Sequence, residues 1–536
     1  MSEMTAKVLD CLLLVPPFWD PICVPLGVSS LNAYLKTNGL ASDIYDFNVD
    51  PQLFGIQKRY FDAIKSMFPI WNDWNIERNG TEMFALHQLA HLRARSSEIR
   101  VELVREILDV TGDGICPVKC RTFEPLLDEM FERVQATTLR LLHHHKPRVV
   151  GLSLYNSNWA SVALVCEITK RFDPSITTVV GGPGPVMGIA SSADQIAGFL
   201  KINPAIDHYV IGEGERALLD LVTSRSPSPR ILGGISATLR LLSTKDRGLS
   251  LHSLPDPDYG SLDPLSYLNL SIATSRGCPY ECSFCAETIF WQGFRSSRHS
   301  DVLQRFDNLA VRYGKTRFYI CDSLSNQVIT PLTEATVGLS RPYTYDCYLR
   351  ADASCGEDAA AKRWHEGGLR RARLGMESAS QRILDDMVKK TDVGKMSRAL
   401  NALAGATIAT STLWIVGYPG ETEVEFEETL KFIADHRLLV YQADAWLFQF
   451  SPFGLSGSAR FSDSGLRQRF SEEMEDVAGF QFHLPRDSIS TKERFNRLRR
   501  FVHYMHHLGV PNPYSMAGLR VANLRWRSLH SKSGGC

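Results

Sequence analysis

The chain contains 536 residues, of which 44% are hydrophobic and 22% are charged, and Lys+Arg and Asp+Glu each number 59. This composition is that of a globular protein, and the length corresponds to about three domains, which excludes a largely disordered chain. Because the formal net charge is zero, the chain as a whole has no electrostatic attraction for nucleic acid or for an anionic membrane, and we expect neither as a partner.

Two further features indicate where the protein works. The short apolar run over residues 8–15 ends at Pro16 and Pro17 without a small-residue cleavage site, and no run reaches the ~18 apolar residues of a transmembrane helix. The 12 cysteines are not the disulfide framework of a small secreted domain. We therefore expect a cytoplasmic protein with reduced thiols.

The first part of the chain alternates strands and helices. Apolar runs predict buried strands at 8–15, 42–47, 149–154, 177–180 and 207–211, and helical spacing predicts helices at 26–36 and 162–171. The alternation predicts a Rossmann-like, doubly wound α/β domain over residues 1–222, with a helical insertion at about 51–146. Ligands of such sheets bind beyond the carboxyl ends of the strands, where Gly- and Pro-rich turns occur here.

A second α/β unit follows a linker. Residues 223–268, rich in Ser, Pro, Gly and Asp, are predicted to be that linker. Six further strands are predicted at 270–274, 317–321, 344–349, 371–376, 410–416 and 442–448. They predict a partial or full (β/α) TIM-type barrel over 269–450, with its active site at the carboxyl ends of the strands. Residues 451–536 are predicted to form a helical C-terminal domain.

The strongest chemical signal is a loop of three cysteines directly after the first predicted barrel strand. Cys278, Cys282 and Cys285 stand in the sequence SRGCPYECSFC, separated by three and two residues. Three thiolates at this spacing ligate three irons of a [4Fe–4S] cluster, which leaves the fourth iron open to chelate a small ligand. A tetrahedral zinc site needs a fourth Cys or His, and no such residue completes the spacing, since His299 is the nearest histidine.

This loop resembles the cluster motif of the radical S-adenosylmethionine (SAM) superfamily, including the aromatic Phe284 before the last cysteine. Two later segments are similar to that family as well: LGMES at 374–378 and GYPGET at 417–422. The resemblance implies SAM contacts from Phe284, Asp322, Ser323, Arg350, Gly375 and Glu377. For Asp322, Arg350 and Glu377, an ion pair at the barrel rim is an equally weighted alternative.

The front domain resembles the cobalamin-binding domain that precedes the barrel in one large branch of this superfamily. The similarity is carried, in the family's order, by VPP (15–17), PLG (25–27), GLS (151–153), GGP (181–183) and GEGE (212–215), and by LPDPDY (254–259) in the linker. Glycine at strand ends lets the backbone approach a flat corrin and its nucleotide tail. The resemblance implies cobalamin contacts from Pro17, Leu26, Gly27, Ser153, Tyr155, Asn156, Gly181, Gly182, Pro183, Gly212, Glu213, Gly214 and Glu215. A plain Rossmann-like domain is the alternative, although no G-x-G-x-x-G for NAD follows the first strand.

The cobalt is expected to lack a protein histidine ligand. The D-x-H-x-x-G motif that supplies such a ligand is absent, and the histidines at 143–145 precede a strand at its amino end, where a solvated turn is predicted. Tyr155, Asn156 and Asn158 are the candidates for the lower face of the corrin. Cys116 and Cys120 have no third ligand near them and are expected to be ordinary thiols.

The resemblance implies a cobalamin-dependent radical SAM methyltransferase. Such an enzyme transfers a methyl group to an unactivated carbon, or a phosphinate phosphorus, of a natural-product or peptide intermediate. One SAM methylates cob(I)alamin, and a second is cleaved to a 5′-deoxyadenosyl radical that abstracts a hydrogen atom from the substrate. The implied cofactors are a [4Fe–4S] cluster, SAM and cobalamin, and the implied partners are a small-molecule or peptide substrate and an electron donor such as a flavodoxin or ferredoxin. No catalytic acid or base is predicted.

Three alternative functions share some of these features. A non-methylating rearrangement or cyclisation would use the same cofactors. A methylthiotransferase would need three cluster cysteines in the front domain and a terminal RNA-binding module, and neither is recognisable in the sequence. A cobalamin-binding sensor would leave the cysteine loop unexplained.

Overall fold

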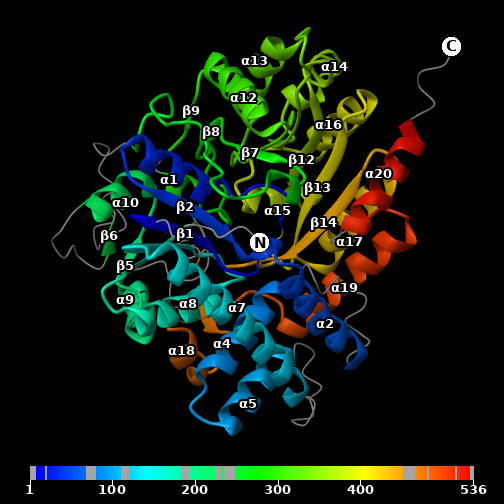
Figure 1. Cartoon of the computed structure of the whole chain (residues 1–536). Coiled ribbons are helices and arrows are strands. Elements are labelled where there is room, and N and C mark those ends of the chain that lie inside the picture. Colours follow the sequence, from blue (N-terminus) through cyan, green and yellow to red (C-terminus); the bar gives the residue numbers. More distant parts are fainter. Residues whose placement is uncertain are drawn as a thin grey trace.

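The computed structural model describes residues 8–18, 21–67, 80–109, 120–182, 193–223, 231–232, 248–291, 293–450, 461, 465–479, 482–512 and 516–530. Within these ranges the chain forms two α/β units, each built around a six-stranded parallel sheet (Figure 1). The predicted α/β class with a doubly wound front domain and a following barrel is confirmed.

The front sheet contains β1 (Cys11–Val15), β2 (Ser42–Asp46), β3 (Val149–Ser153), β4 (Thr177–Gly181), β5 (His208–Val210) and β6 (Ile231–Leu232). Their order is β2-β1-β3-β4-β5-β6. The order reverses between β1 and β3, and the carboxyl ends on either side of such a switch point form a crevice for ligands.

Both faces of the front sheet are covered, as the continuous apolar runs predicted. On β1, Leu12 and Leu14 pack toward α8 (Trp159–Phe172) and α9 (Ala193–Ile202). Cys11, Leu13 and Val15 face the opposite side, where α1 (Leu26–Thr37) and α10 (Gly214–Thr223) lie.

The insertion is helical and thickens one side of the front domain. It contains α2 (Pro51–Met67), α4 (Thr81–Arg93), α5 (Ser97–Leu108) and α7 (Glu124–His145), and α7 packs along α8 (Figure 1). The three histidines form the last turn of α7 rather than the predicted solvated turn, and the ring of His143 meets that of Phe172 edge-on at 4.7 Å. They lie before the amino end of β3. The predicted location is correct, but the local structure is a helix.

The barrel is open and has six parallel strands in sequential order. These are β7 (Leu270–Ile272), β10 (Arg317–Ile320), β11 (Thr344–Arg350), β12 (Leu369–Glu377), β13 (Ala409–Val416) and β14 (Gln442–Leu447). The helices α12 (His299–Tyr313), α13 (Asn326–Thr336), α14 (Asp358–Glu366), α16 (Val393–Gly405) and α17 (Glu423–Asp435) connect them. Residues that follow β7 and β10 line a cavity shared with the front domain, described below.

The segment between the two sheets differs from the predicted linker. Strand β6 lies within it and extends the front sheet beyond residue 222. Asp258 of the LPDPDY segment accepts hydrogen bonds from Asn32 of α1 at 3.3 Å and from Arg312 of α12 at 2.8 Å. This segment therefore fastens the front domain to the barrel.

The C-terminal segment was predicted to be helical, but its described residues also include strands. It contains α18 (Glu472–Ala478), α19 (Thr491–His507) and α20 (Met516–His530), together with a hairpin of β15 (Leu466–Gln468) and β16 (His483–Pro485). Helix α18 packs on α4, α5 and α9 of the front domain, whereas α19 packs on β13 and β14 of the barrel. The segment thus holds the two units together.

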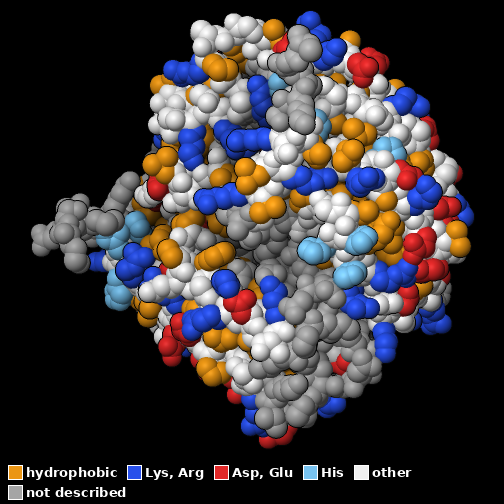
Figure 2. Space-filling model, turned by 90° about the vertical axis from the view of Figure 1, so that its right-hand side faces the viewer, with side chains coloured by type: hydrophobic (Ala, Val, Ile, Leu, Met, Phe, Trp, Pro, Cys, Tyr) orange, Lys and Arg blue, Asp and Glu red, His pale blue; other side chains and the backbone are white. Residues whose placement is uncertain are grey.

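The surface carries charges of both signs. On the face shown in Figure 2, Lys and Arg side chains are interspersed with acidic and apolar ones. A search of the described residues finds no helix with the length and apolar character needed to cross a membrane.

Candidate functional site

The base of the cysteine loop is held by a buried carboxylate. Asp322, just after β10, accepts hydrogen bonds from the backbone nitrogens of Thr274 at 2.7 Å and Ser275 at 2.9 Å, and from both of their hydroxyls. Burial raises the pKa of Asp322 to about 6 against the effect of these donors. Asp322 therefore fixes the backbone that leads into the loop, and its predicted contact with SAM stays a prediction.

The tip of the loop docks on segments far away in the sequence. The backbone nitrogen of Ser283 donates to the carbonyl of Met387 at 2.9 Å, and its hydroxyl lies 2.9 Å from that of Tyr418. Tyr418 belongs to the GYPGET segment, and Phe284 packs against the same apolar group, which includes Met387. The motifs that the sequence singled out separately therefore meet at one place.

The three thiols are close enough to influence one another. Burial, with the negative charges of Glu287, Cys282 and Cys278 as smaller contributions, raises the pKa of Cys285 to about 12. Burial also raises the pKa of Cys278, and the Tyr280 backbone, Arg350 and Lys389 oppose the rise. Iron lowers a thiol pKa far more than such neighbours do, because a coordinating thiol is deprotonated outright.

The three cysteines do not form a single-ion site in the structure. Among the described residues, no three His, Cys, Asp or Glu side chains converge on one point where a metal ion would sit. A [4Fe–4S] cluster spreads its three protein ligands over three separate irons, so its ligands need not converge in this way.

Arg350, at the end of β11, places a guanidinium beside the loop. Its Nη1 lies 3.7 Å from the sulfur of Cys282, and its guanidinium carbon lies 4.0 Å from the ring centroid of Tyr280. Its Nη2 is buried without a hydrogen-bond partner. An unpartnered buried donor fits an anionic ligand group, as predicted for the carboxylate of SAM.

Glu377 ends β12 and pairs with a lysine that the sequence did not predict. The Nζ of Lys389 donates to Glu377 at 2.7 Å, and both side chains are largely buried. A Cβ on Gly375 would lie 2.7 Å from the Glu377 carboxylate and 3.0 Å from Lys389 Nζ. The glycine therefore makes room for the ion pair, and Lys389 also lies over the ring of Phe284 at 5.5 Å.

Ser323 joins a second group at the rim. Its hydroxyl donates to Glu287, which also accepts from the indole nitrogen of Trp291 at 2.8 Å. Ser323 lines a cavity that extends into the front domain. The loop and the front domain thus share one space.

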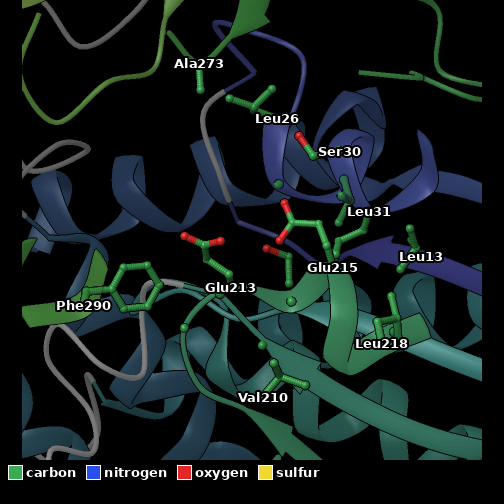
Figure 3. Close-up of a pocket in the computed structure, with 18 of the residues that line it drawn as sticks. Leu13, Leu26, Ser30, Leu31, Val210, Glu213, Glu215, Leu218, Ala273 and Phe290 are labelled. Carbon is green, nitrogen blue, oxygen red and sulfur yellow. The ribbon is translucent and has the colours of Figure 1, made fainter. Parts of the chain in front are cut away.

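A cavity of about 290 Å³ lies between the carboxyl ends of the front strands and the rim of the barrel. Figure 3 shows Leu26, Ser30 and Leu31 of α1 on one wall, Val210 and Leu218 opposite, and Ala273 and Phe290 from the barrel side. The lining is mostly apolar, with the two carboxylates of Glu213 and Glu215 among it (Figure 3).

Most residues predicted to contact cobalamin line this cavity. They are Leu26, Gly27, Ser153, Tyr155, Gly181, Gly182, Gly212, Glu213, Gly214 and Glu215. Pro17 and Asn156 do not line it, and Pro183 lies outside the described residues. Asn156 Oδ1 is buried without a hydrogen-bond partner. Asn158 donates to the carbonyls of Pro16 and Ser153 at 3.1 and 3.0 Å, so it holds the loop together.

The space available for a side chain differs among these glycines. Gly182 has φ +129°, and a Cβ there would lie 2.9 Å from the carbonyl oxygen of Leu154. At Gly27 and Gly212, a Cβ would meet nothing within 4 Å. These two positions leave space at the cavity wall that a side chain would fill.

Glu213 and Glu215 have a partner that sequence reasoning missed. Arg276, two residues before Cys278, pairs with Glu213 at 2.9 Å and with Glu215 at 2.5 Å, and Arg295 also pairs with Glu213. The short antiparallel pair β8 (Ser275–Arg276) and β9 (Arg295–Ser296) positions both arginines. The GEGE turn of the front domain is thereby linked to the cysteine loop. The Arg two residues before the first cysteine and the two Glu of GEGE were the available signal.

Cys120 is buried in the front core, and Cys116 lies outside the described residues. Neither alters the assignment of the loop.

Comparison with known proteins identifies the class. A family model described as the Radical SAM superfamily matches residues 272–433. Residues 272–433 therefore carry a radical SAM domain, a type of domain that uses a [4Fe–4S] cluster and SAM.

A comparison of folds covers nearly the whole chain, including the front domain. It matches that of the radical SAM methyltransferase TsrM from Kitasatospora setae, solved with cobalamin and a [4Fe–4S] cluster bound, with a TM-score of 0.62, 14% identity, and coverage of 99% of this chain and 100% of that one. The chain therefore has the fold of a cobalamin-dependent radical SAM enzyme, front domain and barrel together.

Curated relatives match part of the chain. An anaerobic magnesium-protoporphyrin IX monomethyl ester cyclase of Rubrivivax gelatinosus is 26% identical over 329 residues, which are 58% of this chain and 57% of the relative. The cobalamin-dependent radical SAM methyltransferase TokK of Streptomyces tokunonensis is 23% identical over 330 residues, 53% of this chain and 44% of the relative. The matched part thus spans about half the length of these relatives.

Proposed function

We propose that the protein is a cobalamin-dependent radical SAM methyltransferase acting on an unactivated carbon, or a phosphinate phosphorus, of a natural-product or peptide intermediate. The observation that carries the proposal is the cavity that the front strand ends share with the rim of the barrel. It brings predicted cobalamin contacts next to Ser323 and Arg276, which flank the cluster loop. A flavodoxin or ferredoxin is the proposed electron donor.

In this function the cluster supplies the electron that cleaves SAM to a carbon radical, and cobalamin supplies a transferable methyl group. Cys278, Cys282 and Cys285 would hold the cluster. The unpartnered Nη2 of Arg350 would bind the carboxylate of SAM, and the Glu377–Lys389 pair would present a fixed carboxylate oxygen to the same ligand.

The front cavity supports a role in holding cobalamin. Its volume of about 290 Å³ is close to the lower limit of small-molecule sites, which is about 300 Å³. Gly27 and Gly212 leave open space at its wall. No histidine is among its described lining residues.

A second function is favoured by a specific finding. One relative is named a cyclase, and a non-methylating cyclisation would use the same cofactors. Incubation of the reduced holoenzyme with SAM carrying a deuterated methyl group and with candidate substrates separates the two. A product heavier by a labelled methyl group supports methyl transfer, whereas an unlabelled, dehydrogenated or rearranged product supports cyclisation.

A further inference from the structure

Several side chains on the inward-facing positions of the barrel strands are partly exposed. Side chains alternate between the two faces of a strand, and on the barrel strands the partly exposed positions are those that face inward, including Tyr319, Tyr348, Gly375, Leu413 and Ile415. Their outward neighbours, such as Phe318, Leu349 and Trp414, are buried under the helices. The inward-facing side chains therefore form an inner wall, around the barrel interior (the lumen), that is partly exposed at these positions.

Arg373 of β12 stands in this wall without an anionic partner. Only 9% of it is exposed, and its Nε is buried without a hydrogen-bond partner. No described residue forms an ion pair or accepts a hydrogen bond from its guanidinium. Its guanidinium carbon lies 4.9 Å from the ring centroid of Tyr319 and 5.8 Å from that of Tyr348. The guanidinium is thus set against two aromatic rings.

The other charged groups of the lumen have partners of their own. Arg371 donates from Nε to Ser411 at 2.7 Å and lies over the ring of Tyr441. Asp346 lies 4.0 Å from Arg317, and Asp444 accepts from Gln442 at 2.5 Å. Although the two aspartates favour the charge on Arg373 from a distance, neither forms an ion pair with it.

The position of Arg373 relates it to the proposed chemistry. It precedes Gly375, a predicted SAM contact, by two residues on the same strand, so the Cα atoms of the two residues lie about 7 Å apart. Above it, Leu413 pairs in register with Asp444, and Ile415 pairs with Trp446, which is 42% exposed. The cation fits the acidic end of a ligand, and Leu413, Ile415 and Trp446 offer apolar contacts to its body beside the carboxylate of Asp444.

We propose that Arg373 binds a carboxylate of the substrate, and that the substrate is a small carboxylic acid whose apolar part lies toward the cluster. This inference rests on the proposed radical SAM function and specifies the substrate class of that same site. A guanidinium binds a carboxylate through two parallel hydrogen bonds, and the flanking tyrosine rings would hold the pair in plane.

The test measures binding of acids and their amides to the cluster-reconstituted holoenzyme with SAM, without reductant. The probes are 3-phenylpropanoate and hexanoate, each against its primary amide, observed by saturation-transfer difference NMR under anaerobic conditions. We expect each acid to bind about 10- to 100-fold more tightly than its amide, as for hydrogen bonds between charged groups. R373Q should abolish this preference, R373K should keep part of it, and R371Q, a matched control on the same strand, should retain it.

Several results would overturn the proposal. They are equal binding of acid and amide, no binding of either acid to the wild type, and an acid preference that persists in R373Q. Weaker SAM binding by R373Q would assign the guanidinium to SAM instead. Because the assay requires no turnover, its outcome is independent of whether the labelled-methyl experiment reports methyl transfer or cyclisation.

Discussion

The buried pair of Glu377 and Lys389 allows a quantitative test of the SAM site. The side chains are only 11% and 8% exposed and lie 2.7 Å apart. Lys389→Met would leave the carboxylate buried without its partner, and breaking a buried ion pair in this way costs about 3–5 kcal/mol. For a unit of this size, each kcal/mol lowers Tm by about 2–4 °C, so we expect the barrel transition to fall by about 6–20 °C.

The assay is anaerobic calorimetry of the cluster-loaded protein, together with 5′-deoxyadenosine formation. The double variant Lys389→Met/Glu377→Gln removes both charges and should recover most of the lost stability, since apolar or neutral replacements of a whole buried pair are often nearly neutral. It should not recover SAM cleavage. Lys390→Met, at the exposed neighbouring position, is the control. The argument would be refuted if the Tm losses of Lys389→Met and Glu377→Gln simply added in the double variant. An equal Tm loss in Lys390→Met would refute it as well.

Three further predictions concern the contact between the domains. Arg276→Met should release bound cobalamin while leaving the iron content unchanged, because it removes the ion-pair partner of the buried Glu215 and one of the two arginines that pair with Glu213; unchanged cobalt retention after gel filtration would count against this. Gly182→Ala should destabilise the front domain by about 1–3 kcal/mol, since alanine rarely adopts its φ of +129°, as measured by urea unfolding. Despite burial, the backbone of Gly260 and the charge of Arg312 lower the pKa of Asp258. Its stabilising contribution is therefore present above its unfolded pKa and lost as pH falls below about 4; Asp258→Asn should remove that part of the acid dependence of Tm.

The sequence predicted the elements well because their signals are local. Continuous apolar runs marked strands buried on both faces, and polar residues after them marked the edge where the loop and cavity lie. Strand β6 escaped prediction because two residues in a Ser- and Pro-rich stretch carry no periodicity. The β15–β16 hairpin was missed for a similar reason, since its strands have three residues each.

The partners of the predicted site residues could not be read in the same way. Lys389 is twelve residues from Glu377, and Arg276 is more than sixty from Glu213, so only the folded chain brings them together. Arg373 was overlooked because a charged residue within a strand usually marks a solvated face. Its significance comes from the two tyrosine rings beside it and the absence of an ion pair among the described residues.

The central claim is that one chain holds a cluster in its barrel and cobalamin in its front domain. The most direct measurement is the iron and cobalt content of the full chain after anaerobic reconstitution with iron, sulfide and hydroxocobalamin, followed by gel filtration. We predict about four irons and one cobalt per chain, with the irons lost and the cobalt kept when Cys278, Cys282 and Cys285 are changed together to Ala. A protein that retains four irons but no cobalt, or a triple variant that still holds its irons, would contradict the account.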